Sequence, residues 1–505
     1  MQYEKISAKD LLKIKTLGEL KATGYTPKSI KEELRANLIS KLQKGEQVFE
    51  GIYGYEDTVI PDLERAILSM HNINLLGLRG QAKTRLARMM TKLLDEYIPV
   101  VKGSELNDDP MVPISHAAQD LIKAHGDQTP IEWWHRDDRY AEKLATPDVS
   151  VADLIGDIDP IKAATLKLSY SDERVLHYGM IPRAHRSIFV INELPDLQAR
   201  IQVSLFNILQ EGDIQIRGFK LRLPLDIQFV FTANPEDYTN RGSIVTPLKD
   251  RIESQIITHY PKSIEIGKRI TAQEARLQKR SAGNIHIPEL AKDLIEQVAV
   301  EARSSEYVDE KSGVSARLTI SAYENLMSAA ERRVLINKEE NTVLRVVDFI
   351  GIIPAITGKI ELVYEGEQEG AGIVAQSLIG KSIRSLFLSF FPDPEKSKKE
   401  KENHYAPIME WFGSGNTLDI LTQSSDKTYK ETLSQVPGLE DLVKHYVPKL
   451  ADIEKEFYME FALHGLAEFS QISKKTLETG LQFKDLFSSM FDMTGDLGDE
   501  DEDFS

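Results

Sequence analysis

Apolar residues recur along this chain at two spacings, and each spacing predicts a different kind of element. Over residues 1–50 they fall three to four positions apart, the period of an amphipathic helix, so we expect a helical arm there. Residues 51–260 instead alternate short apolar runs with helical patterns, which is typical of a parallel α/β sheet. The runs at 73–78, 187–193 and 227–232 are the predicted strands.

The remaining segments differ in composition. Residues 261–392 and 404–490 are helical in pattern, and the charged, proline-bearing segment 393–403 between them is a predicted linker. Segment 102–150 follows no regular period, so we expect an insertion with one short helix near its middle. Residues 491–505 form an acidic tail that we expect to be disordered.

Composition excludes several kinds of chemistry. The 505 residues include no cysteine, which excludes thiol catalysis, disulfides and cysteine-type zinc sites. Lys and Arg number 62 against 79 Asp and Glu, a net charge of −17 that argues against general affinity for nucleic acid or for an anionic membrane. No apolar window approaches the ~20 residues of a spanning helix, and no secretory signal is recognisable, so we expect a soluble cytoplasmic protein.

A phosphate-binding loop is the sharpest local signal. The octapeptide GLRGQAKT at 77–84 follows the first predicted strand and precedes a basic helix. Small residues let main-chain N–H groups turn toward an anion, a lysine can reach the outer phosphates, and a threonine hydroxyl can ligate Mg²⁺. A glycine turn between a strand and a basic helix is the alternative, since Ala82 replaces the usual glycine. The candidate nucleotide-binding residues are Gly77, Gly80, Gln81, Ala82, Lys83, Thr84 and Arg85.

Polar residues end the next two predicted strands. Glu193 can polarise an attacking water, and Asn192 before it stands where an aspartate is expected. An amide oxygen is a weaker, uncharged partner for Mg²⁺, so metal affinity or turnover is expected to suffer. Asn234 can hold the attacking water or a γ-phosphate oxygen by a hydrogen bond. Taken singly, each is also compatible with an ordinary strand end or turn.

Two arginines follow these strands in helical segments. Arg251 lies in PLKDRI and Arg317 in SARLT. A planar, permanently charged guanidinium is suited to stabilising charge on a transferring phosphoryl group. Each is also a candidate for an ordinary surface ion pair.

Five motifs in sequence order, GLRGQAKT, FVINELPDL, FTANPEDY, PLKDRIESQI and SARLTIS, resemble those of an AAA+ ATPase over about residues 50–340. The resemblance is to the branch that contains the magnesium-chelatase ATPase subunit (subunit I) and the MoxR-type ATPases. It implies ATP and Mg²⁺ as cofactors. It also implies an α/β fold: a P-loop parallel sheet with helices on both faces, then a helical lid domain within 261–392 and a mostly helical C-terminal extension.

The resemblance assigns a role to each motif. Segment 170–185 is similar to the family's helix-2 insert, and 212–224 is similar to its pre-sensor hairpin. The implied catalytic and metal-binding roles are Walker A for Lys83 and Thr84, Walker B for Asn192 and Glu193, sensor 1 for Asn234, the arginine finger for Arg251 and sensor 2 for Arg317.

An arginine finger acts on a neighbour's nucleotide, so the resemblance implies a homo-oligomeric, hexameric ring. It further implies a partner protein with a von Willebrand A domain. The expected function is an ATPase that remodels or activates a partner, with a metal-insertion chaperone as one form. A nucleotide-gated scaffold with weak hydrolysis, motivated by Asn192, and a DNA-acting AAA+ relative are the alternatives.

Overall fold

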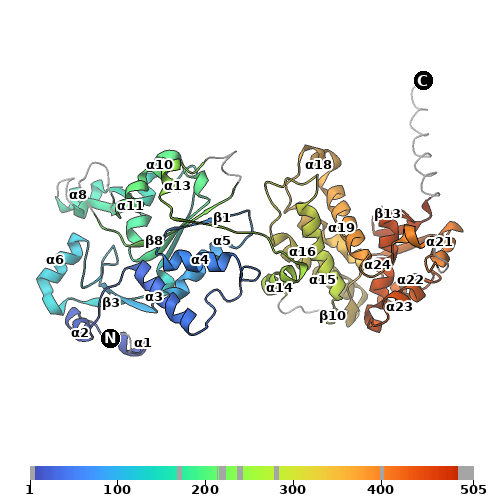
Figure 1. Cartoon of the computed structure of the whole chain (residues 1–505), viewed down its shortest axis with the longest axis horizontal. Helices are drawn as coiled ribbons and strands as arrows, with labels where there is room; N and C mark the ends of the chain where they lie inside the picture. Colours follow the sequence, from blue (N-terminus) through green and yellow to red (C-terminus); the bar gives the residue numbers. More distant parts are fainter. Residues whose placement is uncertain are drawn as a thin grey trace, which may run out of the picture. The chain divides into compact units, whose positions relative to one another are not determined.

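The computed structural model describes residues 6–167, 173–212, 214, 223–235, 243–277, 284–398 and 403–486. The chain divides into two compact units, Met1–His259 and Tyr260–Ser505 (Figure 1). Across the described parts of both units, every helix is too short or too polar to cross a lipid bilayer.

A parallel sheet lies at the centre of the first unit. Its five strands are hydrogen-bonded in the order β4, β7, β8, β1, β9. Both β7 and β8 are buried along almost their whole length, as expected for strands covered on both faces. The strands are β1 (Ile73–Leu76), β4 (Tyr140–Leu144), β7 (Ser187–Asn192), β8 (Ile227–Ala233) and β9 (Ser254–Ile257).

Alternate residues of each strand supply two separate hydrophobic cores. Ile188 and Val190 of β7 pack with helices on one face, whereas Phe189 and Ile191 pack with helices on the other. This is the period of two that a strand requires. The predicted parallel sheet with helices on both faces is confirmed. The first face is covered by α3 (Ile30–Gln43), α4 (Val59–Leu68) and α5 (Lys83–Met89), and the second by α10 (Ala199–Ser204), α11 (Phe206–Glu211) and α13 (Thr246–Asp250).

Part of the predicted N-terminal arm belongs to this core. Helix α3 begins after Ser29, whose side chain accepts a hydrogen bond from Glu32 N in a capping box. Leu34 and Leu38 of α3 are buried in the same cluster as the sheet. Two shorter helices, α1 (Ala8–Leu11) and α2 (Leu17–Ala22), precede α3.

Segment 102–150 contains more regular structure than the one short helix that its sequence predicted. Its one predicted helix is α6 (His116–His125). In addition, β3 (Ile131–His135) pairs antiparallel with β2 (Tyr97–Val101), and β4 is an edge strand of the central sheet. The sequence of β4, YAEKL, has no apolar run because this edge strand is only partly buried.

The two implied AAA+ insertions fall partly outside the described residues. The described part of segment 170–185 contains β6 (Leu176–Tyr178) and α9 (Met180–Arg183), and β6 pairs antiparallel with β5 (Gly156–Ile158). Helices α7 (Val151–Leu154) and α8 (Pro160–Leu166) lie nearby in sequence. Most of segment 212–224, and the whole acidic tail 491–505, lie outside the described residues.

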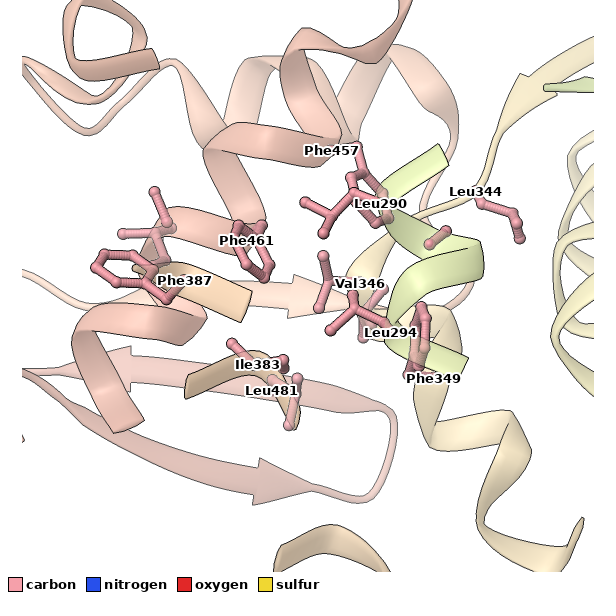
Figure 2. Packing of buried hydrophobic residues seen from close by; sticks show 14 of the residues in the cluster. Leu290, Leu294, Leu344, Val346, Phe349, Ile383, Phe387, Phe457, Phe461 and Leu481 are labelled. Carbon is pink, nitrogen blue, oxygen red and sulfur yellow. The ribbon is translucent and has the colours of Figure 1, made fainter. Parts of the chain in front are cut away.

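The second unit is mainly helical around one core. In Figure 2, Leu290 and Leu294 belong to the same buried cluster as Phe461 and Leu481, although at least 167 residues separate the two pairs in sequence. The elements up to residue 387 are α14 (Ile264–Glu274), β10 (Asn284–His286), α15 (Glu289–Arg303), α16 (Arg317–Asn337), β11 (Asn341–Val343), α17 (Ile353–Thr357), α18 (Tyr364–Glu369) and α19 (Ala371–Phe387).

The C-terminal region adds strands that the helical pattern did not predict. An antiparallel sheet has the order β12, β14, β13. In the predicted linker 393–403, a short helix α20 (Pro394–Ser397) has buried ends. The other elements are α21 (Ala406–Gly413), β12 (Leu418–Leu421), α22 (Asp426–Leu433), α23 (Leu439–Tyr446), α24 (Lys455–Glu468), β13 (Ser473–Leu477) and β14 (Gly480–Lys484).

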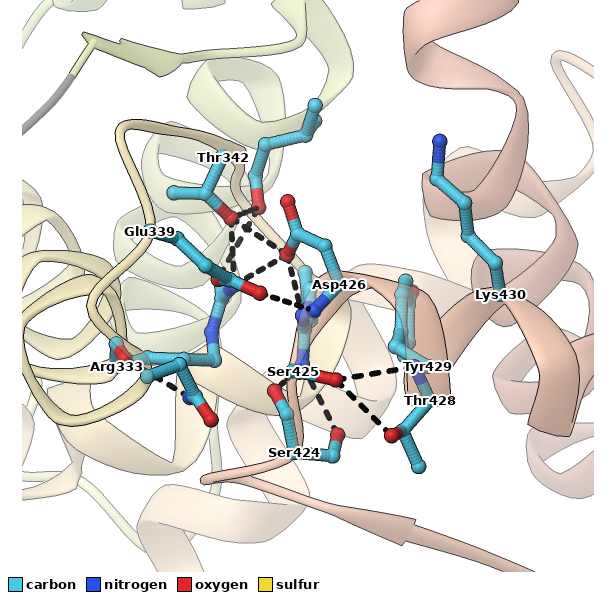
Figure 3. A network of polar contacts seen from close by, with 12 residues as sticks. Arg333, Glu339, Thr342, Ser424, Ser425, Asp426, Thr428, Tyr429 and Lys430 are labelled. Atoms are coloured by element: carbon cyan, nitrogen blue, oxygen red, sulfur yellow. Dashed lines mark hydrogen bonds and ion pairs between the residues drawn. The ribbon is translucent and has the colours of Figure 1, made fainter.

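A buried polar network joins the early helices of this unit to the later ones. The guanidinium of Arg333 on α16 donates to Asp348 at 2.9 Å. It also donates to Asp426 on α22 at 3.1 Å (Figure 3). Arg345 also pairs with Asp426 and lies 4.2 Å from the Tyr429 ring centre. Residues before and after the predicted linker 393–403 are therefore in contact within the same unit.

Candidate nucleotide site

Three loops meet at one edge of the first unit's sheet. Because β1, β8 and β7 are neighbouring parallel strands, their carboxyl ends lie together. Loop 77–82 follows β1, Asn192 is the last residue of β7, and Asn234 directly follows β8. The predicted phosphate loop, carboxylate and sensor residue are therefore neighbours in space.

The loop after β1 has a constrained backbone. A Cβ at Gly77 would lie 2.0 Å from Thr258 Oγ1 and 2.2 Å from Gln81 Oε1, so only glycine fits there. The Thr258 hydroxyl donates to Gln81 Oε1 at 2.7 Å, which ties the loop to the end of β9. Gly80 at φ +74° and Ala82 at φ +58° are both in the left-handed region. Ala82 thus adopts the conformation that the expected glycine would adopt freely.

Lys83, the first residue of α5, is buried beside this loop. Its ammonium group donates to Gly77 O, to Leu78 O at 3.1 Å and to Asn234 Oδ1 at 2.8 Å. Only 7% of the residue is exposed. A buried cation is stabilised when an anion approaches, because charge–charge attraction is strong where water is excluded. Lys83 is therefore placed to bind a phosphate held by the loop.

Thr84 and Asn192 bring two neutral oxygens together. The Thr84 hydroxyl donates to Asn192 Oδ1 at 3.1 Å. Hydroxyl and amide oxygens are the kind of ligand that Mg²⁺ accepts. In the described ranges, no group of three or more His, Cys, Asp or Glu side chains could hold a metal ion. The hydroxyl of Thr84 and the amide oxygen of Asn192 therefore fit Mg²⁺ whose other ligands are phosphate oxygens and water.

Glu193 follows β7 in a conformation that is unusual for this residue type. Its φ is +55°, in the left-handed region. Its Oε2 accepts a hydrogen bond from Asn234 Nδ2 at 3.0 Å, while Asn234 Oδ1 accepts from Lys83. Non-glycine residues in this region cluster at functional sites. A carboxylate held this way beside the phosphate loop is suited to polarising a water molecule.

The structure does not bring Arg251, the predicted arginine finger, into this cluster. Arg251 donates to Gln210 Oε1 at 2.8 and 3.0 Å and to Pro247 O at 2.8 Å, and its guanidinium lies 5.2 Å from the Phe206 ring centre. Arg317 is the first residue of α16 in the second unit, with an exposed side chain. Arg85 on α5 is also exposed.

Sequence reasoning missed several supporting residues. Thr232 of β8 accepts from Glu193 N at 3.1 Å and donates to Asn192 Oδ1 at 3.2 Å. The Tyr55 hydroxyl lies 3.0 Å from Gln81 O and 2.7 Å from His259 O. A threonine inside the apolar strand IQFVFTA is a usable signal, because a buried hydroxyl needs a partner. Tyr55 lies in an irregular segment and carries no comparable signal.

Comparison with known proteins gives one family match. Residues 165–257, which include β7, β8 and β9, match the sigma-54 interaction domain, an AAA+ domain. This segment includes Asn192, Glu193 and Asn234.

Three solved structures are similar at low identity. NtrX from Brucella abortus is 14% identical with a TM-score of 0.33; the match covers 62% of this chain and only 56% of NtrX. A putative ATPase from Cytophaga hutchinsonii is 15% identical with a TM-score of 0.29, covering 72% of this chain and 97% of that one. The complex between magnesium chelatase subunits BchI and BchD is 17% identical with a TM-score of 0.33, covering 63% and 98%.

The strand order, the loop and the matched segment agree with one another. Strand β1 comes first in the sequence, yet in the sheet it lies between β8 and β9, the last two strands. The phosphate loop follows this inner strand, and the matched segment supplies the polar residues that face it. The first unit therefore has the α/β fold of an AAA+ domain.

Proposed function

We propose that this protein binds ATP with Mg²⁺ at the edge of the sheet and hydrolyses it as a hexameric ring that remodels a partner protein. The observation that carries the proposal is the chain of contacts Lys83–Asn234–Glu193, at 2.8 and 3.0 Å. ATP hydrolysis requires a lysine that binds the phosphates and a carboxylate that activates water to lie close together. Here the lysine follows the loop after β1 and the carboxylate follows β7.

Each residue has a definite role in this reaction. Loop 77–82 and Lys83 bind the β- and γ-phosphates, and Thr84 with Asn192 would hold Mg²⁺ directly or through its waters. When bound, Mg²⁺ neutralises charge on the phosphate oxygens. Glu193 accepts a proton from the attacking water as the water oxygen bonds to the γ-phosphorus. The bond from that phosphorus to the bridging oxygen breaks, and ADP leaves with the electron pair.

Arg251 is proposed to complete a neighbour's site. Its hydrogen bonds to Gln210 and Pro247 keep it away from its own Lys83 cluster, which suits a residue that acts across a subunit boundary. The test mixes two inactive proteins. Arg251→Ala keeps an intact nucleotide site, and Lys83→Ala keeps an intact finger. If the finger acts in trans, the mixture hydrolyses ATP faster than either protein alone; additive background rates would contradict the ring.

The resemblance to the magnesium-chelatase and MoxR branch supports a partner protein as the object of remodelling. A von Willebrand A domain protein is the expected partner, and metal insertion is one form such remodelling takes. The experiment is a pull-down with Glu193→Gln protein in ATP, which should hold the partner in the nucleotide-bound state. Lys83→Ala protein is the matched control and should release the partner.

One observation favours a second candidate function. Asn192 supplies a neutral oxygen where a carboxylate is expected, which favours a nucleotide-gated scaffold that binds ATP and hydrolyses it slowly. Asn192→Asp tests this alternative. An increase of about tenfold or more in turnover supports the scaffold, and an unchanged rate with unchanged Mg²⁺ dependence removes its basis.

A further inference from the structure

Thr232 lies beside the two polar residues that end β7. The register pairs Ile191 of β7 with Phe231 of β8, so Asn192 and Thr232 are level with each other on neighbouring strands. Thr232 is 1% exposed. Its Oγ1 is 3.1 Å from Glu193 N and 3.2 Å from Asn192 Oδ1. One buried hydroxyl thus contacts both residues of the Walker B pair.

The chemistry of these groups fixes the direction of each hydrogen bond. A backbone N–H can only donate, so Thr232 Oγ1 accepts from Glu193 N. The single hydroxyl proton of Thr232 is then available for Asn192 Oδ1, which also accepts from Thr84 at 3.1 Å. Two hydroxyl donors therefore converge on the amide oxygen of Asn192.

This convergence matters because residue 192 is an asparagine. The two oxygens of an aspartate are equivalent, so that side chain faces Thr84 equally well in either orientation. An asparagine turned over would instead present its NH₂ group to Thr84. The NH₂ would then compete for the Thr84 lone pair that a Mg²⁺ ligand needs.

We propose that Thr232 is a positioning residue for the nucleotide site. It keeps the amide oxygen of Asn192 toward Thr84, and it holds the backbone of Glu193 in its left-handed conformation. The proposal rests on the proposed function, because it assigns a residue to the Mg²⁺ side of the ATP site.

The experiment compares ATP binding in four proteins: wild type, Thr232→Val, Thr232→Ser and Asn192→Asp. Calorimetric titration with ATP at a series of MgCl₂ concentrations, and in EDTA, reads out metal dependence without requiring turnover. We expect Thr232→Val to need about tenfold more Mg²⁺ for half-maximal ATP binding, the effect of losing one buried hydrogen bond. Thr232→Ser, which keeps the hydroxyl, should stay within about twofold of wild type. Binding in EDTA should be equal in wild type, Thr232→Val and Thr232→Ser, because none of these adds a charge beside the phosphates.

The double variant Thr232→Val with Asn192→Asp separates positioning from simple packing. If Thr232 orients the amide, the valine effect on Mg²⁺ dependence falls to less than about threefold when residue 192 is an aspartate. An equal effect in both backgrounds, or no effect on the asparagine background, overturns the proposal. If Thr232→Val protein does not fold, Thr232→Ala takes its place in the same comparison. Wild-type protein that binds no ATP at all would overturn the proposed function, a result distinct from these.

Discussion

The ammonium group of Lys83 lies 2.8 Å from Oδ1 of Asn234, to which it donates a hydrogen bond. These residues are 151 positions apart in sequence and come from the loop after β1 and the end of β8. Asn234 also donates to Glu193, so one amide connects Lys83 with Glu193. In the proposed reaction, this amide would report to Glu193 whether Lys83 is engaged by a phosphate.

Substitution of Asn234 should separate binding from hydrolysis. Asn234→Ala leaves the phosphate loop intact but removes the hydrogen bond from Asn234 to Glu193 Oε2, so we expect ATP affinity within about threefold of wild type and turnover reduced by about 10²-fold. Asn234→Asp should weaken ATP binding itself, because its carboxylate pairs with Lys83 and repels phosphate. Calorimetric ATP binding and steady-state phosphate release measure the two effects. Wild-type turnover in Asn234→Ala protein would contradict this role.

The backbone at Ala82 predicts which side chains the loop tolerates. At φ +58°, a β-branched residue is strongly disfavoured, whereas glycine adopts this conformation without strain. Ala82→Val should weaken ATP binding by about tenfold or more, equivalent to about 1.4 kcal/mol. Ala82→Gly should bind ATP at least as tightly as wild type. A valine variant with wild-type affinity would show that the loop rearranges on binding.

A buried ion pair joins α3 to the residue before β4. Arg139 donates to both carboxylate oxygens of Glu33 at 2.7 Å, and both side chains are at most 5% exposed. Arg139→Met leaves a buried carboxylate without its cation, so we expect a loss of about 3–5 kcal/mol in unfolding free energy. The control is Lys13→Met at the exposed Lys13–Asp10 pair, where the loss should be under about 1 kcal/mol. Chemical denaturation of the full chain measures both, and equal losses would count against a structural role for α3.

Glu296 makes the stability of the second unit depend on pH. Burial raises the pKa of this carboxyl on α15 from 4.5 to about 7, although Thr271 donates to it at 2.5 Å. A raised pKa means that the folded state binds the proton more tightly than the unfolded state. Its stabilising contribution is full below about pH 4.5 and is lost as the pH rises through about 7.

Replacing this carboxyl with an amide should make the unfolding free energy less dependent on pH. We expect the unfolding free energy of Glu296→Gln protein, relative to wild type, to increase by up to about 3 kcal/mol between pH 4.5 and 8. Thermal melting at pH 5, 6, 7 and 8 measures the difference. The exposed Glu310→Gln is the matched control and should follow wild type. A wild-type profile in the Glu296 variant would show that this group does not titrate in that range.

The sequence predicted those parts of the fold that repeat a strong local pattern. Strands β7 and β8 are buried on both faces, so each is a continuous apolar run visible in the sequence. The edge strand β4 is partly exposed and mixes charged with apolar residues, so its place in the sheet could not be predicted. Strand β13 (SKKTL) has no apolar alternation, and β14 (GLQFK) alternates apolar with polar residues over only five positions, which is too short a run to separate from the helical pattern around it.

In the candidate site too, residues within sequence motifs were predicted, whereas residues that support the site through packing were not. Lys83, Thr84, Glu193 and Asn234 lie in or directly after recognisable motifs, and parallel strand order brings them together. The supporting contacts of Thr258 and Tyr55 depend on how β9 and an irregular segment pack around the loop. Such packing is a tertiary property with no local sequence pattern.

ATP hydrolysis by purified protein, compared with Lys83→Ala and Glu193→Gln, tests the central claim most directly. The account predicts Mg²⁺-dependent phosphate release by wild type. Lys83→Ala should lose ATP binding and turnover together, whereas Glu193→Gln should keep binding and lose turnover by at least about 10²-fold. Turnover at the wild-type rate in both variants would contradict the account, because ATP would then be hydrolysed at some other place.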